Sequence, residues 1–398
     1  MNLIRCLHIT DLKEANEELQ RIGLDPADTE GHPKKTLQVN LKIEGLDPKV
    51  ANFLKQEWLS MGGEAAFDGK GLDCSNPAID GLLMGHQKKF EAFLQNLEAY
   101  PDLQTIVHAL KEALKNILKN QFTLRCGQRT FNLGERTLLM GILNVTPDSF
   151  SDGGLYFNQQ QAIAHGLRMA QEGADIIDVG GESTRPGSKP LDLEEELRRV
   201  LPVIEVLSRE TDLPISIDTY KAEVARRAIE AGAEIINDIS GLRFDPALAT
   251  VAAQAHVPMV LMHIRGTPET MQKDVHYNSL FSEILTYLKD AIERAESAGV
   301  DPDQIIIDPG IGFGKTFNQN LLLIKHLHEF RILGKPILLG TSRKSFIGKI
   351  LGTDPDQRLE GTLASIAVGV LNGAHIIRAH DVLQAKRAIA VADAIRTA

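Results

Sequence analysis

Residues 138–145 read LLMGILNV and residues 174–181 read ADIIDVGG, two short apolar runs that resemble six further runs downstream. The eight runs occupy residues 138–145, 174–181, 214–219, 233–240, 258–264, 304–310, 336–342 and 374–381. They are apolar almost throughout, which is typical of strands buried on both faces in a parallel sheet. Eight strand–helix units in series predict an α/β fold of the (β/α)8 TIM-barrel type.

Helix-like stretches separate the runs, and several end at a glycine, the residue that most easily adopts the left-handed conformation of a helix end. These glycines are Gly173, Gly232, Gly299 and Gly373. An open doubly wound sheet is the alternative fold, but eight regular units are more than it usually uses. The hairpin-like segment FTLRCGQRTFNLG, residues 122–134, precedes the first run and is a candidate plug for the bottom of the barrel.

The first 120 residues follow a different pattern. They contain strand candidates at residues 3–9 and 36–46, helix candidates at 12–23 and from Asp47-Pro48 onward, a strand and helix over 81–100, and an amphipathic helix over 102–120. We therefore expect a small α+β domain at residues 1–121, followed by the barrel at 122–398. The first domain shows no clear polar constellation, so an accessory or oligomerisation role is the expectation.

The bulk composition restricts the class of protein. The net charge of −10 argues against nucleic acid as a partner. No apolar run reaches the roughly 20 residues that span a bilayer, and the start of the chain lacks the features of a signal peptide. We therefore expect a cytoplasmic protein. Cys6, Cys74 and Cys126 are scattered, which indicates reduced thiols without a metal or disulfide framework.

Polar residues occur where the apolar runs end, and this is the face on which TIM barrels carry their active sites. The run ends carry Asn144, Asp178, Asp218, Asn237, His263, Asp308, Ser342 and Arg378 with His380. A single aspartate in such a place is often only the cap of the next helix. Eight polar strand ends on one rim instead predict a shared binding site.

These polar groups also sort by chemistry. Asp218, Asn237 and Asp308 suit the ring N–H, amino and carbonyl groups of a flat heterocycle. Arg378, His380 and Ser342 form an anion-binding corner, at the strands where barrels often bind phosphate. Asn144 offers an oxygen of the kind that Mg²⁺ accepts beside diphosphate. Apolar faces for a ring come from Phe150, Met262 and Phe313.

The segments 141–154 (GILNVTPDSFSDGG) and 174–188 (ADIIDVGGESTRPGS) resemble the two signature segments of the dihydropteroate synthases. Shorter matches follow in the family's order: SIDT, NDISG, LMHIRGTPETMQ, DPGIGFGK, GTSRKSFIG and IIRAHDV. The resemblance covers about 275 residues from Phe122 to the end and leaves the first 120 outside. Small departures occur at Ile264, Arg265 and Ala379, none of them at a position expected to be catalytic.

The resemblance implies an enzyme, usually a homodimer, that joins a pterin diphosphate to p-aminobenzoate with Mg²⁺ as cofactor. It implies that Asp218, Asn237, Asp308 and Lys344 hold the pterin, with Arg378 flanking the ring and Met262 packing nearby. Asn144 would bind the Mg²⁺ on the diphosphate, and Arg378, His380 and Arg185 would contact its oxygens. The p-aminobenzoate site would comprise Phe150, Thr184, Arg185, Pro186, Phe313, Lys344 and Ser345. Lys344, Asp308, Arg378 and Asp218 are the expected catalytic residues.

Three other functions remain open at this point. A methyltransferase barrel that binds methyltetrahydrofolate shares the pterin-holding Asp and Asn, but it does not need the NVTPDSF and SRKS segments present here. A barrel that has lost activity could serve as a scaffold, although every mapped site position is occupied. The N-terminal domain could add a second activity, but no motif indicates one. The GKT at residues 314–316 lacks the preceding glycine of a phosphate loop and is discounted.

Overall fold

The computed structural model describes residues 7, 9, 11–22, 32–68, 78–146 and 154–398. The chain divides into two compact units, Met1–Lys115 and Asn116–Ala398. The division falls within helix α5 (Gln104–Leu118), a few residues before the boundary expected from the sequence. Most of the strand expected at residues 3–9 lies outside the described residues.

The second unit contains a sheet of eight parallel strands in the order β11-β10-β9-β8-β7-β6-β13-β12. The strands are β6 (Leu138–Asn144), β7 (Ile176–Gly180), β8 (Ile215–Asp218), β9 (Ile235–Asp238), β10 (Met259–Met262), β11 (Ile305–Asp308), β12 (Leu338–Leu339) and β13 (Ile376–Ala379). A parallel bridge between Ile307 and Ile337 joins the two edges of the sheet. The ring is closed in this way, so the predicted TIM barrel is confirmed and the open doubly wound sheet is wrong.

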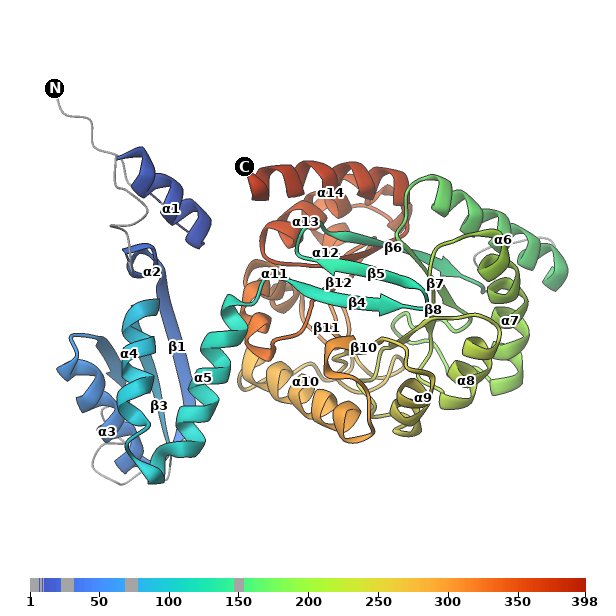
Figure 1. The fold of residues 1–398 in the computed structure, drawn as a ribbon. Helices are drawn as coiled ribbons and strands as arrows, with labels where there is room; N and C mark the ends of the chain where they lie inside the picture. Colours follow the sequence, from blue (N-terminus) through green and yellow to red (C-terminus); the bar gives the residue numbers. More distant parts are fainter. Residues whose placement is uncertain (1–6, 8, 10, 23–31, 69–77, 147–153) are drawn as a thin grey trace. The chain divides into compact units, whose positions relative to one another are not determined.

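Helices surround the strands on the outside of the barrel (Figure 1). They are α6 (Gly154–Gln171), α7 (Leu193–Glu210), α8 (Ala222–Glu230), α9 (Ala247–Ala255), α10 (Leu280–Ser297), α11 (Phe317–Lys325), α12 (Ser345–Leu351), α13 (Leu359–Leu371) and α14 (Val382–Thr397). The four glycines expected at helix ends all have positive φ, between 95° and 110°. Among the described residues, no helix has both the length and the apolar character needed to cross a membrane.

The barrel interior is filled at its amino-terminal end. Side chains such as Leu138, Ile176 and Val260 point inward from the strands and form one buried cluster with Leu124 and Leu133. The last two belong to the antiparallel hairpin of β4 (Phe122–Cys126) and β5 (Arg129–Leu133), which confirms the predicted plug. Because this end is closed by apolar packing, the polar strand tips at the other end are the place for a ligand.

The first unit is a small α+β structure, as expected. Its three antiparallel strands run in the order β1-β3-β2. Its elements are α1 (Leu12–Arg21), α2 (His32–Thr36), β1 (Gln38–Leu46), α3 (Pro48–Ser60), β2 (Glu64–Phe67), β3 (Ile79–His86), α4 (Gln87–Leu97) and most of α5. Helix α3 begins as predicted: Asp47 caps it by accepting a hydrogen bond from the amide of Lys49 at 2.8 Å.

Candidate active site

The polar strand tips converge on one end of the barrel, as the sequence predicted. Asp218 at the end of β8 is the register partner of Asn237 on β9. Met262 on β10 pairs in the same way with Asp308 on β11. Most of these side chains are buried: Asn237 and Asp308, for example, are only 5% and 6% exposed. Carboxylates and amides that are buried together at the mouth of a barrel are typical of a ligand site.

Arg378 on β13 is the centre of this cluster. Its Nε lies 2.6 Å from Asp178 Oδ2, and its Nη2 lies 2.6 Å from Asp218 Oδ2. Asn237 Nδ2 donates to the same Asp178 oxygen at 3.0 Å. One guanidinium group therefore connects strands β7, β8 and β13, and the amide of Asn237 adds β9. The orientation of Arg378 is fixed before any substrate arrives.

Burial and charge together shift the pKa values in the cluster. Burial raises the pKa of Asp218 to about 7; Arg378 opposes the rise and Asp178 adds to it. Burial also raises the pKa of Asp308, against the hydrogen bond from the Gly310 amide and the charge of Lys344. The pKa of Arg378 is raised, because Asp178 and Asp218 outweigh the opposing effect of burial. Strongly shifted pKa values gathered in one cluster at the mouth of the barrel favour a functional site over a purely structural one.

Lys344 lies directly before α12, in the loop after β12, and β12 is the neighbour of β13, the strand of Arg378. Its Nζ is 4.2 Å from the centre of the Phe313 ring, and the pKa of Lys344 falls to about 8 because of burial and the nearby charge of Arg378. The preceding Arg343 has a left-handed φ of 55° and forms a two-point ion pair with Asp381. This backbone conformation turns the side chain of Arg343 away and leaves Lys344 beside Phe313.

His380 and Ser342 are brought together as expected, but His380 does not supply positive charge. Ser342 Oγ lies 2.9 Å from His380 Nδ1. Burial, with the neighbouring Arg343 and Arg378, lowers the pKa of His380 to about 3. The imidazole is therefore neutral at physiological pH, and the cation of this corner is Arg378.

Fewer contacts define the positions of the remaining predicted residues relative to the Arg378 cluster. Asn144 ends β6 in register with Gly180, which is in turn in register with Asp218, so the Asn144 side chain belongs to the same rim. Thr184 is half-buried, whereas Arg185, Pro186 and Ser345 are exposed. Among the described residues, no hydrogen bond or ion pair joins these four side chains to the Arg378 cluster. Phe150 lies outside the described residues.

Two residues were missed when roles were assigned from the sequence. Asp178 was recognised as a strand end but was given no role, although it is fully buried and bonds Arg378. Its position in the second run, matching Asp218 in the third, was the available signal. Lys315 was dismissed with the phosphate-loop fragment; it is buried, and its Nζ lies 2.7 Å from His263 Nδ1 and 3.2 Å from the Phe313 carbonyl. Lys315 thus joins the loops that follow β10 and β11.

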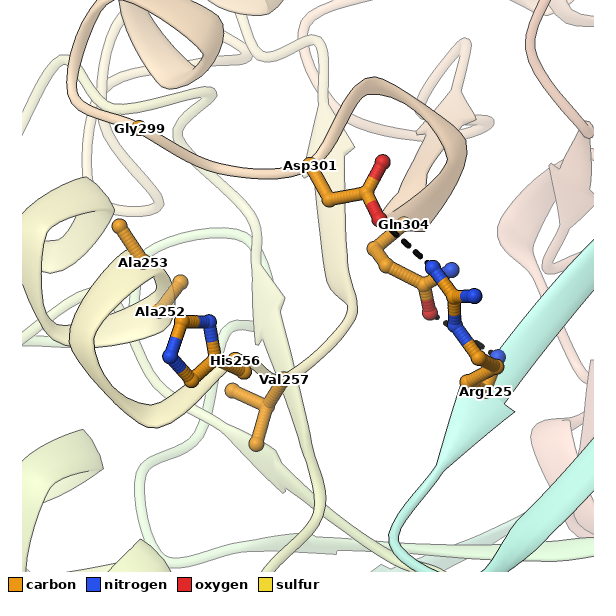
Figure 2. A pocket seen from close by; sticks show the side chains of 8 residues that line it. All are labelled: Arg125, Ala252, Ala253, His256, Val257, Gly299, Asp301 and Gln304. Atoms are coloured by element: carbon orange, nitrogen blue, oxygen red, sulfur yellow. Dashed lines mark hydrogen bonds and ion pairs between the residues drawn. The ribbon is translucent and has the colours of Figure 1, made fainter.

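A second hollow lies at the amino-terminal end of the barrel, far along the strands from this cluster. This cavity of about 190 Å³ is lined by Arg125, His256, Asp301 and Gln304 with four smaller residues (Figure 2). Arg125 Nη2 donates to Asp301 Oδ2 at 2.8 Å, and the backbone amide of Arg125 donates to Gln304 Oε1. The cavity shares no residue with the rim cluster, so we do not assign the chemistry to it.

The fold and the rim cluster define an enzyme of the TIM-barrel class that binds its ligand at the carboxyl ends of the strands. The family model described as pterin binding enzyme matches residues 140–380. A dihydropteroate synthase of Synechocystis is 51% identical over 273 residues, which cover 68% of this chain and 94% of that protein. The chain therefore belongs to the dihydropteroate synthase family, transferases of folate biosynthesis.

Solved structures agree with this assignment. A dihydropteroate synthase of Xanthomonas albilineans with 4-aminobenzoic acid has 45% sequence identity and a TM-score of 0.65, over 70% of this chain and 99% of that one. The same protein in complex with 7,8-dihydropteroate gives 43% identity and a TM-score of 0.63, over 69% of this chain and 99% of that one.

One further relative also aligns with the residues before the barrel. A probable bifunctional folylpolyglutamate synthase/dihydropteroate synthase of Halobacterium salinarum is 38% identical over 98% of this chain. The present chain spans about half of that relative, 47% of its length. The first unit therefore has a counterpart in a longer protein, although this alignment assigns no activity to it.

Replacing Asp178 by Asn should keep the shape of the cluster but remove one of the two ionic partners of Arg378. Loss of one partner from a buried charge pair costs about 2 kcal/mol, so kcat/KM should fall roughly thirtyfold. Steady-state kinetics with both substrates measure this change. The control is Asp175→Asn, which disturbs the pair with Arg136 at the other end of the barrel, where the Asp175 side chain is 10% exposed and that of Arg136 is 49% exposed. Equal losses in the two variants would contradict the role given to Asp178.

Proposed function

We propose that this barrel condenses 6-hydroxymethyl-7,8-dihydropterin diphosphate with p-aminobenzoate, forming 7,8-dihydropteroate and diphosphate. The observation that carries the proposal is the cluster of Asp218, Asn237, Asp308 and Arg378 at the mouth of the barrel. The 4-aminobenzoic acid and 7,8-dihydropteroate bound to the Xanthomonas relative support these substrates.

Asp218, Asn237, Asp308 and Lys344 are the groups we assign to the pterin. A pterin presents ring N–H and amino donors together with a carbonyl acceptor, and these residues supply carboxylate and amide acceptors with one ammonium donor. Met262 and Phe313 belong to one buried apolar cluster at the same mouth, which gives the ring a flat apolar neighbour. Arg378 flanks the ring.

The reaction breaks the C–O bond between the pterin methylene and the diphosphate, and it forms a C–N bond to the arylamine. The bonding pair of the C–O bond leaves with the diphosphate, and the methylene carbon becomes positively charged, with the charge delocalised into the ring. The lone pair of the neutral amine then attacks this carbon, and one N–H proton is released. The barrel mainly has to stabilise separated charge and exclude water.

Arg378 and Asp308 are placed to stabilise these charges. The Nε and Nη2 of Arg378 are held by Asp178 and Asp218, and among the described residues no acceptor engages Nη1, which remains for the diphosphate. Ser342 with His380 adds neutral hydrogen-bonding groups at the same corner. The carboxylate of Asp308 lies where it stabilises positive charge on the ring. Because the arylamine already carries its lone pair, no strong general base is needed.

The arylamine site is assigned to half-buried and exposed residues at the edge of the mouth. Thr184, Arg185 and Pro186 follow β7, and Ser345 begins α12 beside Lys344 and Phe313. Arg185 is also assigned to the diphosphate oxygens. Phe150, which lies outside the described residues, is assigned to the same site from the sequence alone.

Asn144 is the residue we assign to Mg²⁺. Its amide oxygen is a hard ligand on the rim, and one protein oxygen together with diphosphate oxygens and water suits Mg²⁺. The described residues contain no group of three or more His, Cys, Asp or Glu that would hold a metal without the substrate. When bound, the ion would neutralise charge on the diphosphate leaving group.

We also propose that the chain forms a homodimer in the cytoplasm, where the buried thiol of Cys126 stays reduced. The adjacent helices α13 and α14 expose Val368, Leu371, Val391 and Ile395, each at least 45% exposed. An apolar surface of this kind is typical of a dimer interface.

The first unit, proposed from the sequence as residues 1–121, is assigned an accessory role. Small molecules are the proposed ligands, and nucleic acid is not expected for a chain with a net charge of −10.

Incubation of the purified protein with the pterin diphosphate, p-aminobenzoate and Mg²⁺ should yield 7,8-dihydropteroate, detected by mass spectrometry. Lys344→Ala should lower kcat/KM roughly a hundredfold, because a hydrogen bond to a charged group contributes up to about 3 kcal/mol. Lys349→Ala, an exposed lysine on the same helix, is the control. No product from the intact protein would refute the function, and near-normal turnover by Lys344→Ala would refute the pterin-site assignment.

Removal of divalent metal by a chelator should abolish condensation, and added Mg²⁺ should restore it. The Asn144→Ala variant should need a higher Mg²⁺ concentration for half-maximal rate, because one protein oxygen is lost from the ion. Titration of initial rates against free Mg²⁺ measures both effects. Full activity in excess chelator, or an unchanged Mg²⁺ requirement in the variant, would contradict the role of Asn144.

Replacing Val391 and Ile395 together by Glu should convert the dimer to a monomer, because four carboxylates would then face one another across the symmetric interface. Light scattering coupled to size-exclusion chromatography gives the mass directly. Leu322→Glu on α11, an exposed apolar residue outside this surface, should leave the mass unchanged. A monomeric intact protein, or a dimer that survives the double replacement, would refute the proposed interface.

A further inference from the structure

The loop that joins β7 to α7, residues 182–191, is called the arm here. It carries Thr184, Arg185 and Pro186 away from the strand, and their side chains are among the more exposed of the rim. A loop with such an exposed tip needs to be held if the tip is to meet a substrate in one geometry. The structure shows which residue holds it.

Lys221, from the junction between β8 and α8, contacts both ends of the arm. Its Nζ lies 2.6 Å from Glu182 Oε2 at the start of the arm and 2.8 Å from the Leu191 carbonyl at its end. The third contact is to Glu196 Oε2 in α7, at 2.5 Å. The three protons of the ammonium group are therefore matched by three acceptors.

The two carboxylates are themselves enclosed. Glu182 accepts from the Tyr220 hydroxyl at 2.8 Å, and Glu196 accepts from the Thr219 hydroxyl at 2.7 Å. The side chains of Glu182 and Glu196 are only 7% and 1% exposed. Burial would lower the pKa of Lys221, but the hydrogen bonds to both carboxylates outweigh it and the pKa is raised. Lys221 therefore stays charged, and neither buried carboxylate is left without a partner.

The arm is also attached at its tip. The Gly187 amide donates to the Pro268 carbonyl in the loop after β10, at 3.0 Å. A cavity of about 170 Å³ lies between these two loops, lined in part by Pro190, Tyr220 and Phe244. Because the space behind the arm is not filled by side chains, packing alone does not determine where the tip stands. The hydrogen bond at the tip and the attachments at the base have to do so together.

Lys221 also follows Asp218 in the chain by three positions, so it lies in the short connection after the strand tip that we assign to the pterin. A common ion pair that only adds stability would not need to join both ends of one loop. This geometry connects the strand of Asp218 directly to the base of the arm.

We propose that Lys221 is a positioning residue for the second substrate: it joins both ends of the arm so that Thr184 and Arg185 meet p-aminobenzoate in a fixed geometry. The inference rests on the proposed function, in which the arm forms part of the arylamine site. Lys221 itself touches neither substrate.

The test compares Lys221→Met with Lys335→Met. Lys335 is a fair control because it makes the same kinds of contact at the other end of the barrel, to Glu296 Oε1 and to the Pro302 carbonyl, both at 2.8 Å. Lys221→Met should raise KM for p-aminobenzoate by roughly tenfold to a hundredfold, the effect of a small misplacement of a substrate-positioning group. The dissociation constant of the pterin diphosphate should rise by a clearly smaller factor, because Arg185 alone of the arm is assigned to the diphosphate and the pterin ring is held by other residues.

Lys221→Arg should restore most of the affinity, because a cation again bridges the two carboxylates. Amide hydrogen exchange at Gly187 should be faster in Lys221→Met than in the intact protein or in Lys335→Met. Equal weakening of both substrates, or the same kinetic change in both methionine variants, would overturn the proposal and leave Lys221 as a stability residue.

Tyr220→Phe keeps the experiment decisive should Lys221→Met fail to fold, since it removes only one hydroxyl bond to Glu182. It should also raise KM for p-aminobenzoate, by a smaller factor than Lys221→Met, and an unchanged KM would count against the proposal.

Arg185→Ala tests the assignment of the arm to the arylamine separately from the positioning role of Lys221. If Arg185→Ala leaves KM for p-aminobenzoate unchanged, the assignment of the arm to the arylamine fails and the positioning role falls with it. If the intact protein forms no dihydropteroate, the proposed function itself has failed.

Discussion

The pairing of Arg378 with two buried carboxylates is the interaction on which the rest of the site depends. Without Arg378, Asp178 and Asp218 would be two like charges buried side by side, an arrangement that is strongly unfavourable. With it, three strands share one ionic group, and Asn237 adds a fourth through its amide. The same contacts that stabilise the mouth of the barrel also fix the cation that faces the diphosphate. Stability and chemistry are therefore coupled at this end.

The interior at the other end of the barrel is apolar, so it needs no comparable ionic group to hold its strands together. There Leu124, Cys126 and Leu133 of the hairpin fill the interior against apolar strand residues. Because the strands are parallel, every carboxyl end lies on one side, and the polar residues at those ends face a single mouth. The strands therefore hold the groups assigned to the pterin, and loops such as residues 182–191 carry groups assigned to the second substrate.

The barrel was predictable because its signal is local: each strand is a continuous apolar run, and four helices end at glycines with positive φ. The strand-tip residues Asp218, Asn237, Asp308 and Arg378 followed from that pattern. Contacts between distant positions were not predictable. Lys221 meets Glu182 and Glu196, 39 and 25 positions away, and no sequence period links them. Strand β2 (Glu64–Phe67) was missed because it is short and contains no β-branched residue.

The most direct test of this account is a crystal structure of the protein with a non-hydrolysable analogue of the pterin diphosphate. The account predicts that the ring lies within hydrogen-bonding distance of Asp218, Asn237, Asp308 and Lys344, with Arg378 beside it and still bonded to Asp178. A pterin bound elsewhere, for instance in the cavity near His256 and Asp301 (Figure 2), would contradict it.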